Sequence, residues 1–95
     1  MVTHIVLFKL KDRSEESARR AQTVIASMKG QIPGLLDLEV GVDFSREARS
    51  YDVALITRHA TRADLDAYQV HPVHERVKEY IASVRDVSNA VDFES

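Results

Sequence analysis

The apolar residues of this chain recur with two different spacings, one typical of strands and one typical of helices. Residues 2–10 and 51–59 carry apolar side chains on both faces of an extended strand, whereas residues 35–44 and 87–93 carry them mainly on one face. Strands that are apolar on both faces are typical of the covered centre of a sheet. The sequence therefore predicts two central strands, the first and the third, and two edge strands, the second and the fourth.

Two segments with the apolar periodicity of a helix lie between these strands. Ser14 can cap a helix that ends by Gly30, and the apolar residues of this helix recur at steps of three and four. Thr61 and Asp64 form a capping-box pattern that starts a second helical region, which continues to about Val84. The apolar stripe of the first helix comprises Ala18, Ala21, Ile25, Met28 and Ile32.

Pro72 divides the second helical region into two helices. Proline lacks an N–H group and disfavours a helical backbone at the residue before it, so one helix should end near Val70 and the next should carry Pro72 in its first turn. Tyr68, His71 and His74 flank this joint at equal spacing, and all three can share or move protons. The joint is therefore where we expect any chemistry of this chain to lie.

The predicted order of elements is strand, helix, strand, strand, helix pair, strand. A right-handed crossover makes the first and second strands parallel, and a third strand between them with a fourth beside the first gives the sheet order 4-1-3-2. This is an α+β, ferredoxin-like βαββαβ subunit, and residues 1–95 are expected to form a single domain. The order also puts the two strands that are apolar on both faces at the centre of the sheet.

One face of this predicted sheet is left without a cover. Both helical regions lie on the same face, so the other face of the central strands would expose an apolar patch that is unusual for a monomer. A second copy packed sheet against sheet across a twofold axis would cover it. Burying about 1,000 Å² of apolar surface would contribute on the order of 25 kcal/mol before the costs of association. We therefore expect a homodimer, in which two sheets form a dimeric α+β barrel with an apolar lumen.

Composition narrows the possible partners and cofactors. The net charge of −2 gives no basic surface for nucleic acid or for an anionic membrane, and the absence of cysteine excludes disulfides and thiolate metal sites. No apolar run is long enough to span a membrane, and the apolar N-terminal residues are expected to form a strand rather than a signal peptide. No phosphate-binding or dinucleotide-binding motif occurs, so no cofactor is expected, and a cytoplasmic location is the default.

Six short segments resemble the stress-responsive dimeric α/β-barrel (Dabb) family, and together they cover almost the whole chain in order. The most specific segment is Tyr-Gln-Val-His-Pro-Val-His at 68–74. The other five are His-Ile-Val-Leu-Phe-Lys-Leu-Lys at 4–11, Ile-Pro-Gly-Leu at 32–35, Val-Gly-Val-Asp at 40–43, Tyr-Asp-Val-Ala-Leu at 51–55 and Val-Asp-Phe-Glu at 91–94. The resemblance implies the same ferredoxin-like subunit and the same barrel dimer.

The resemblance also implies site residues. A plant polyketide cyclase similar to this family closes a linear polyketide by an aldol step with a tyrosine and a histidine, which fall on Tyr68 and His74 here. A histidine in the first strand of that enzyme falls on His4. Its strand-three histidine falls on Val53, so this chain lacks one polar group of that pocket, which argues against the same substrate.

Several candidates have both a functional and a structural interpretation. His74 could act as a general base and Tyr68 as a hydrogen-bond donor to an oxyanion, but each could instead be a core residue held by a hydrogen bond. His4 shares a strand face with Val6 and Phe8, and we assign this face to the lumen as ligand-binding positions. A single histidine on an apolar strand face is, however, more often structural.

The remaining polar candidates are weaker. His71 at the joint most simply caps the next helix, although it could also contact a ligand, and His59 at a strand end is expected to be exposed. His71 and His74 could share a metal ion, as could Asp37 and Glu39 on one strand face. Neither pair supplies enough protein ligands for a closed site, so no metal site is expected.

Two functions therefore remain open. The first is a barrel protein that binds a small apolar, carbonyl-bearing molecule in the dimer lumen, and cyclises or isomerises it with His74 as base and Tyr68 as oxyanion donor. The second is a non-catalytic stress-response or structural dimer whose histidines hold the fold together.

Overall fold

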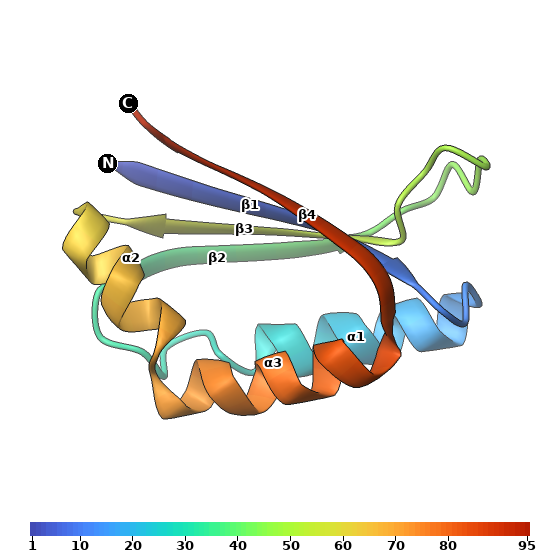
Figure 1. Ribbon diagram of the computed structural model, residues 1–95, viewed down its shortest axis with the longest axis horizontal. Coiled ribbons are helices and arrows are strands. Elements are labelled where there is room, and N and C mark those ends of the chain that lie inside the picture. The colour runs from blue at the N-terminus through green and yellow to red at the C-terminus, as the bar shows by residue number, and fades with distance from the viewer.

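The computed structural model describes all 95 residues and contains the elements that the sequence predicts (Figure 1). The four strands are β1 (Val2–Leu10), β2 (Leu35–Val42), β3 (Val53–His59) and β4 (Arg85–Glu94), and the three helices are α1 (Glu15–Ala26), α2 (Arg62–Gln69) and α3 (Pro72–Val84). The sheet order is β2-β3-β1-β4, which is the predicted order counted from the other edge, and every neighbouring pair is antiparallel. The predicted α+β, ferredoxin-like subunit is confirmed.

Side-chain caps begin all three helices. Ser14 and Thr61 each accept a backbone hydrogen bond in the first turns of α1 and α2. The Nδ1 atom of His71 accepts one from the N–H of Val73 at 3.1 Å, and Pro72 follows as the first residue of α3. The joint between α2 and α3 therefore forms where the sequence predicts it, and the expected capping role of His71 is confirmed.

Three elements are shorter than the sequence predicts, and the third strand is one of them because it begins at Val53 instead of at residue 51. The first helix ends at Ala26, and the chain then turns through Gly30, whose φ of 76° is in the region that favours glycine. Ile32 remains buried although it lies beyond the helix. The second strand ends at Val42, so Phe44, which was predicted to continue its apolar face, is 93% exposed in the loop that follows.

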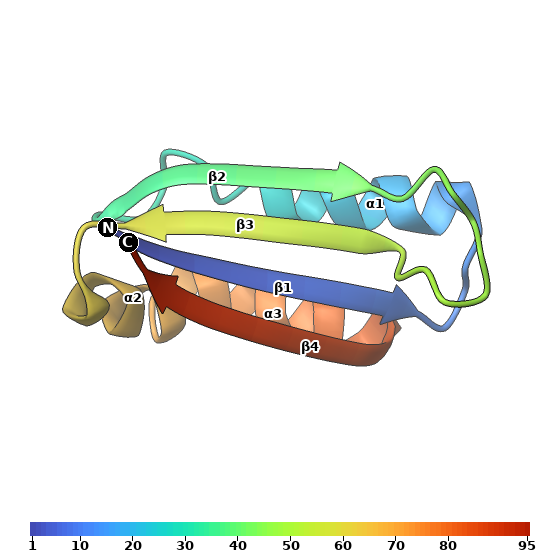
Figure 2. The same cartoon turned by 90° about the horizontal axis from the view of Figure 1, so that it is seen from above.

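All three helices cover the same face of the sheet (Figures 1 and 2). His4, Val6 and Phe8 of β1 lie on this covered face, because they line a cavity together with residues of α1 and α3. The sequence analysis assigned this face to a lumen between two sheets, which is wrong. Alternation separates the two faces of a strand that is apolar on both sides, but it does not tell which face the helices cover.

The opposite face of the sheet is open, as the predicted topology requires (Figure 2). Ile5 and Ile56 face each other across the β1–β3 pair at the middle of this open face. Around them lie four apolar side chains that are between 37% and 55% exposed, namely Leu7, Val87, Val91 and Phe93. No helix of the chain has the length and apolar character needed to cross a membrane.

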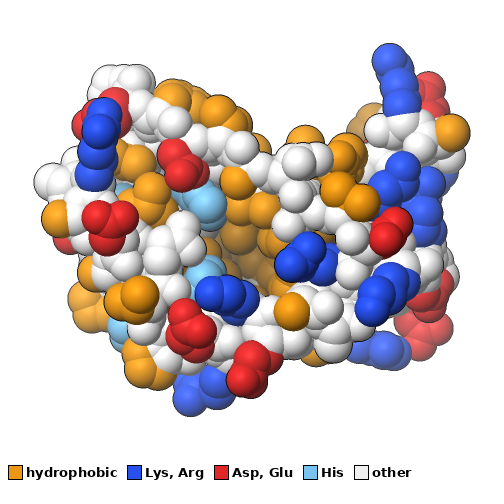
Figure 3. All heavy atoms as spheres, in the orientation of Figure 1, with side chains coloured by type: hydrophobic (Ala, Val, Ile, Leu, Met, Phe, Trp, Pro, Cys, Tyr) orange, Lys and Arg blue, Asp and Glu red, His pale blue; other side chains and the backbone are white.

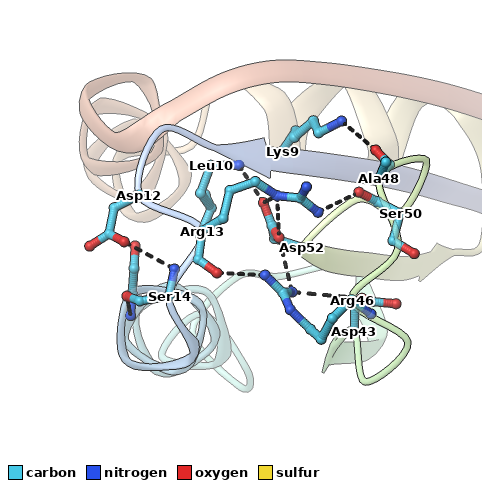
Figure 4. A network of polar contacts seen from close by, with 11 residues as sticks. Lys9, Leu10, Asp12, Arg13, Ser14, Asp43, Arg46, Ala48, Ser50 and Asp52 are labelled. Carbon is cyan, nitrogen blue, oxygen red and sulfur yellow. Dashed lines mark hydrogen bonds and ion pairs between the residues drawn. The ribbon is translucent and has the colours of Figure 1, made fainter.

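A buried carboxylate ties the loop after β2 to the end of β1 (Figure 4). Asp52 is 0% exposed and accepts hydrogen bonds from the N–H of Leu10 at 2.8 Å and from the Arg13 guanidinium at 3.1 Å, and it pairs with the Arg46 guanidinium at 3.0 Å. Burial alone would raise the pKa of Asp52, but these hydrogen bonds outweigh burial and hold the pKa below its ordinary value. The carboxylate is therefore charged and fully engaged at neutral pH.

Candidate functional site

A cavity of about 360 Å³ lies between the helix-covered face of the sheet and α3. Figure 3 shows it as a hollow with apolar side chains in its depth and histidine side chains at one end. Ten of its sixteen lining residues are hydrophobic, which is typical of small-molecule sites. The structure brings together here five of the residues that the sequence analysis singled out: His4, Val6, Phe8, Tyr68 and His74.

The ring of Tyr68 is surrounded by three imidazoles. Its centroid lies 4.5 Å from that of His74, 5.0 Å from His59 and 6.1 Å from His4. The side chain is fully buried, yet its hydroxyl has no hydrogen-bond partner, whereas most buried hydroxyls have one. Burial raises the pKa of Tyr68 to about 12, so the hydroxyl keeps its proton at neutral pH. The structure therefore contains a buried O–H donor that no protein group uses.

The imidazole of His74 projects into the cavity from the first turn of α3. Its Nδ1 atom lies 3.0 Å from the carbonyl oxygen of Gln69, the last residue of α2. A carbonyl only accepts hydrogen bonds, so Nδ1 carries the proton and the lone pair of the neutral ring is on Nε2. Burial lowers the pKa of His74 below its ordinary value of 6.5, which keeps the ring neutral near pH 7. The hydrogen bond at the joint between α2 and α3 thus sets the tautomer of this side chain, whereas burial keeps it uncharged.

A carboxylate from β4 holds His4, which lies on the sheet side of the cavity. Nδ1 of His4 contacts Oδ1 of Asp92, and the two residues face each other in the β1–β4 ladder. An ionised carboxylate cannot donate, so Nδ1 is the donor and the neutral ring keeps its lone pair on Nε2. The sequence analysis missed Asp92, although the predicted place of the fourth strand beside the first already put it within reach of His4.

The other candidates lie outside this cavity. His71 caps α3, and Val53 is buried on the helix-covered sheet face but lines a different hollow, beside Leu7. The prediction that His59 is exposed is wrong: it is 0% exposed, and its Nε2 atom lies 3.0 Å from Oγ1 of Thr57. The end of a central strand is covered here because α2 packs over it.

Acidification is expected to destabilise the fold through His59 and His74. Burial lowers the pKa of both residues below 6.5, so below that pH the unfolded chain takes up protons that the folded chain does not. Their contribution to the free energy of unfolding is complete above pH 6.5 and is lost as pH falls towards the lowered pKa values. The slope is at most about 1.4 kcal/mol per pH unit for each histidine. Urea unfolding between pH 7.5 and 5 measures it, and a profile as steep in the His59→Gln/His74→Gln variant would contradict this origin.

Three of the four side chains that the sequence analysis weighed as cation ligands, those of Asp37, His71 and His74, are engaged within the protein. Asp37 forms an ion pair with Arg58 at 2.8 Å, and the Nδ1 atoms of His71 and His74 make the hydrogen bonds described above. No group of three or more histidine or carboxylate side chains is placed to hold a metal ion.

These features define a ferredoxin-like α+β domain with an apolar cavity under its helices and two imidazoles in the cavity wall. The chain belongs to the stress-responsive A/B barrel domain (Dabb) family, whose family model matches residues 2–95. The resemblance inferred from the six sequence segments is confirmed by this match.

Relatives and solved structures agree with this membership. The chain is 31% identical over 102 residues to the stress-response A/B barrel domain-containing protein DABB1 of Arabidopsis thaliana, a match that covers 98% of this chain and 46% of that protein. The chain thus spans less than half the length of this relative. A dimeric ferredoxin-like protein of unknown function from Thermobifida fusca has a TM-score of 0.87 at 27% identity, covering 99% of this chain and 90% of that one. A dimeric protein of unknown function from Bacteroides fragilis has a TM-score of 0.84 at 26% identity, and the match covers 99% of this chain and 95% of that one.

Proposed function

We propose that this domain binds a small apolar, carbonyl-bearing molecule in the cavity under α3, and that His74 and Tyr68 act on its carbonyl group. The observation that carries the proposal is the buried Tyr68 hydroxyl, which has no partner in the protein, on a side chain that lines the cavity beside the imidazole of His74. A buried donor without a partner costs free energy, and a ligand oxygen would satisfy it. The site lies within one subunit rather than in a lumen between two sheets.

His74 has the features of a general base in this proposal. Its Nε2 lone pair is free because Nδ1 donates to the carbonyl of Gln69, and its lowered pKa keeps it neutral near pH 7. A neutral imidazole can remove a proton from the carbon next to a carbonyl group. The negative charge then moves onto the carbonyl oxygen as an enolate.

Tyr68 would stabilise this enolate. Its hydroxyl is protonated at neutral pH because burial raises its pKa to about 12, so it can donate a hydrogen bond to the oxygen as charge develops there. His4, held by Asp92, would offer a second imidazole that can accept a proton in the same cavity. An isomerisation needs only the return of the proton at another atom of the enolate. An aldol cyclisation needs the enolate carbon to attack a second carbonyl carbon of the same molecule, and the oxygen of that carbonyl then takes up the proton.

A non-catalytic role remains the alternative. His74 also links α3 to the last residue of α2 through its hydrogen bond to Gln69, and His71 caps α3. In this alternative the histidines stabilise the joint, and the cavity is only a packing defect. It leaves the unpartnered hydroxyl of Tyr68 without an explanation.

Ligand binding by the Tyr68→Phe and His74→Gln variants tests the proposal. We expect a thermal-shift screen of aromatic and polyketide-like carbonyl compounds to give at least one ligand, and each variant to bind it about three- to tenfold more weakly. Without ligand, Tyr68→Phe should melt at the same temperature as the wild type or higher, because it removes a buried hydroxyl that has no partner.

The matched control is His71→Asn, which keeps a helix-capping side chain outside the cavity and should leave binding unchanged. Unchanged binding by both cavity variants, together with a melting temperature several degrees lower for Tyr68→Phe, would favour the structural role.

We also propose that two copies pair through the open sheet face. The apolar side chains around Ile5 and Ile56 support this pairing, and so do the two structural relatives described as dimeric. The cavity lies on the other side of the sheet, so the pairing would leave its mouth free.

A further inference from the structure

One stripe of α3 runs along the mouth of the cavity. His74, Lys78 and Ala82 all line the cavity, and their spacing of four residues keeps them on one side of α3. Arg85 also lines the cavity, from the first position of β4 directly after the helix. At 1.5 Å per residue, the Cα atom of Lys78 lies about 6 Å along the helix from that of His74, and Arg85 lies beyond the last turn of the helix. The mouth of the cavity is thus lined by the proposed base His74, by the Lys78 cation one turn further along α3, and by the Arg85 cation just after the end of the helix.

The charge of this lining is one-sided. The chain contains more acidic than basic residues, 15 against 13, yet the only fully charged side chains that line the cavity are Lys78 and Arg85. Arg85 has no ion-pair partner in the structure. Lys78 has only the weak contact with Glu75 on its own helix, at 3.8 Å, and its side chain is 63% exposed. Figure 3 shows basic side chains at the rim of the hollow.

The interior of the cavity differs from this rim. Towards the sheet the walls are largely apolar, formed by residues such as Val6, Phe8 and Leu55. The uncharged polar groups of the lining are those of Tyr68, Gln69, Ser88 and the two imidazoles. A ligand that fits both parts has an apolar body inside and a negative charge at the mouth. Lysine and arginine have long, flexible stems, so both charged groups can reach an anion between them.

We infer that the cavity selects an amphipathic organic anion, a molecule with an apolar body and a carboxylate that Lys78 and Arg85 bind at the mouth. The inference rests on the proposed function, because it names the class of ligand for the same cavity. The carboxylate lies outside, towards solvent, and the apolar body places its reactive carbon near His74 and Tyr68. The Asp92 carboxylate does not compete for the two cations, because it does not line the cavity and is bound to His4.

The test compares octanoate with octanamide, which has the same chain and shape but no charge. Both are titrated into the wild-type protein and followed by the backbone amide shifts of Tyr68 and His74. We expect octanoate to bind about tenfold more tightly than octanamide, and salt to reduce this preference. In the Lys78→Gln/Arg85→Gln variant the two affinities should agree within twofold, because octanamide binding does not depend on the cations.

Arg76→Gln is the matched control, because Arg76 lies on the same helix but lines a different hollow, and its removal should keep the tenfold preference. Equal affinities for octanoate and octanamide in the wild type would overturn this inference and leave the proposed function standing. A preference that survives in the double variant would overturn it as well. If neither compound shifts Tyr68 or His74, both the inference and the apolar-ligand proposal are wrong.

Discussion

Replacing Ile56 with lysine is expected to convert the proposed homodimer into a monomer. Ile56 lies at the middle of the open sheet face, opposite Ile5, and it is accessible in the single subunit, so the substitution should leave the subunit folded. In a sheet-to-sheet dimer the same position is buried, and a twofold axis brings two lysines into the interface. Burying them would cost about 5 kcal/mol or more in total, which weakens association roughly 5,000-fold.

Light scattering at micromolar concentration measures this change directly. The wild type should have about twice the subunit mass of 10.7 kDa, and Ile56→Lys should have the subunit mass itself. Val70→Lys is the matched control, since Val70 is 73% exposed at the joint between α2 and α3, away from the open face, and this variant should stay dimeric. A wild-type mass near 10.7 kDa would disprove the pairing.

Asp52→Asn is expected to lower the free energy of unfolding by about 3 kcal/mol at pH 7. Each carboxylate oxygen of Asp52 faces donors: the N–H of Leu10 and the guanidinium groups of Arg13 and Arg46. The amide of asparagine keeps only one acceptor oxygen. Its NH₂ group would face the donors that the second carboxylate oxygen accepts from, and an NH₂ group cannot accept their hydrogen bonds. The side chain is 0% exposed, so water cannot replace the lost acceptor.

Urea unfolding of Asp52→Asn against Asp86→Asn separates this effect from a general loss of charge. Asp86 is exposed and should change stability by less than 0.5 kcal/mol, as surface substitutions generally do. Because the pKa of Asp52 is held below its ordinary value of 3.8, its contribution is complete above that pH and is lost as pH falls below it. The gap between wild type and variant should therefore close only in strong acid. A loss of less than 1 kcal/mol at pH 7 would show that the network is not needed for stability.

The order of the strands could be predicted because the sequence features that indicate it, namely a proline, helix-cap residues and apolar patterns, keep their local meaning in the folded protein. Pro72 fixes the joint between two helices, Ser14 and Thr61 mark helix starts, and two strands that are apolar on both faces belong at the centre. Helix and strand ends were less predictable. The stripe that reaches Ile32 continues the helical period past Ala26, although the backbone has already turned.

The candidate site could be predicted only in part. Tyr68 and His74 were found because they flank the joint, but the choice of cavity was wrong because two apolar faces of β1 look alike in sequence. The predicted strand order placed Asp92 near His4, but the register that makes the two residues face each other is decided by tertiary contacts, as is the packing of α2 over His59. The missing partner of the Tyr68 hydroxyl has no sequence signal at all, because an absent hydrogen bond leaves no pattern.

β1 separates the cavity on one face of the sheet from the open face on the other. Its even-numbered side chains, His4, Val6 and Phe8, face the cavity, whereas Ile5 and Leu7 face the side where a second copy would sit. Under the two proposals above, neighbouring residues of this one short strand would govern ligand binding and dimer assembly separately. A substitution at an odd-numbered position would then change how two copies associate without changing ligand binding. A substitution at an even-numbered position would change ligand binding without changing association.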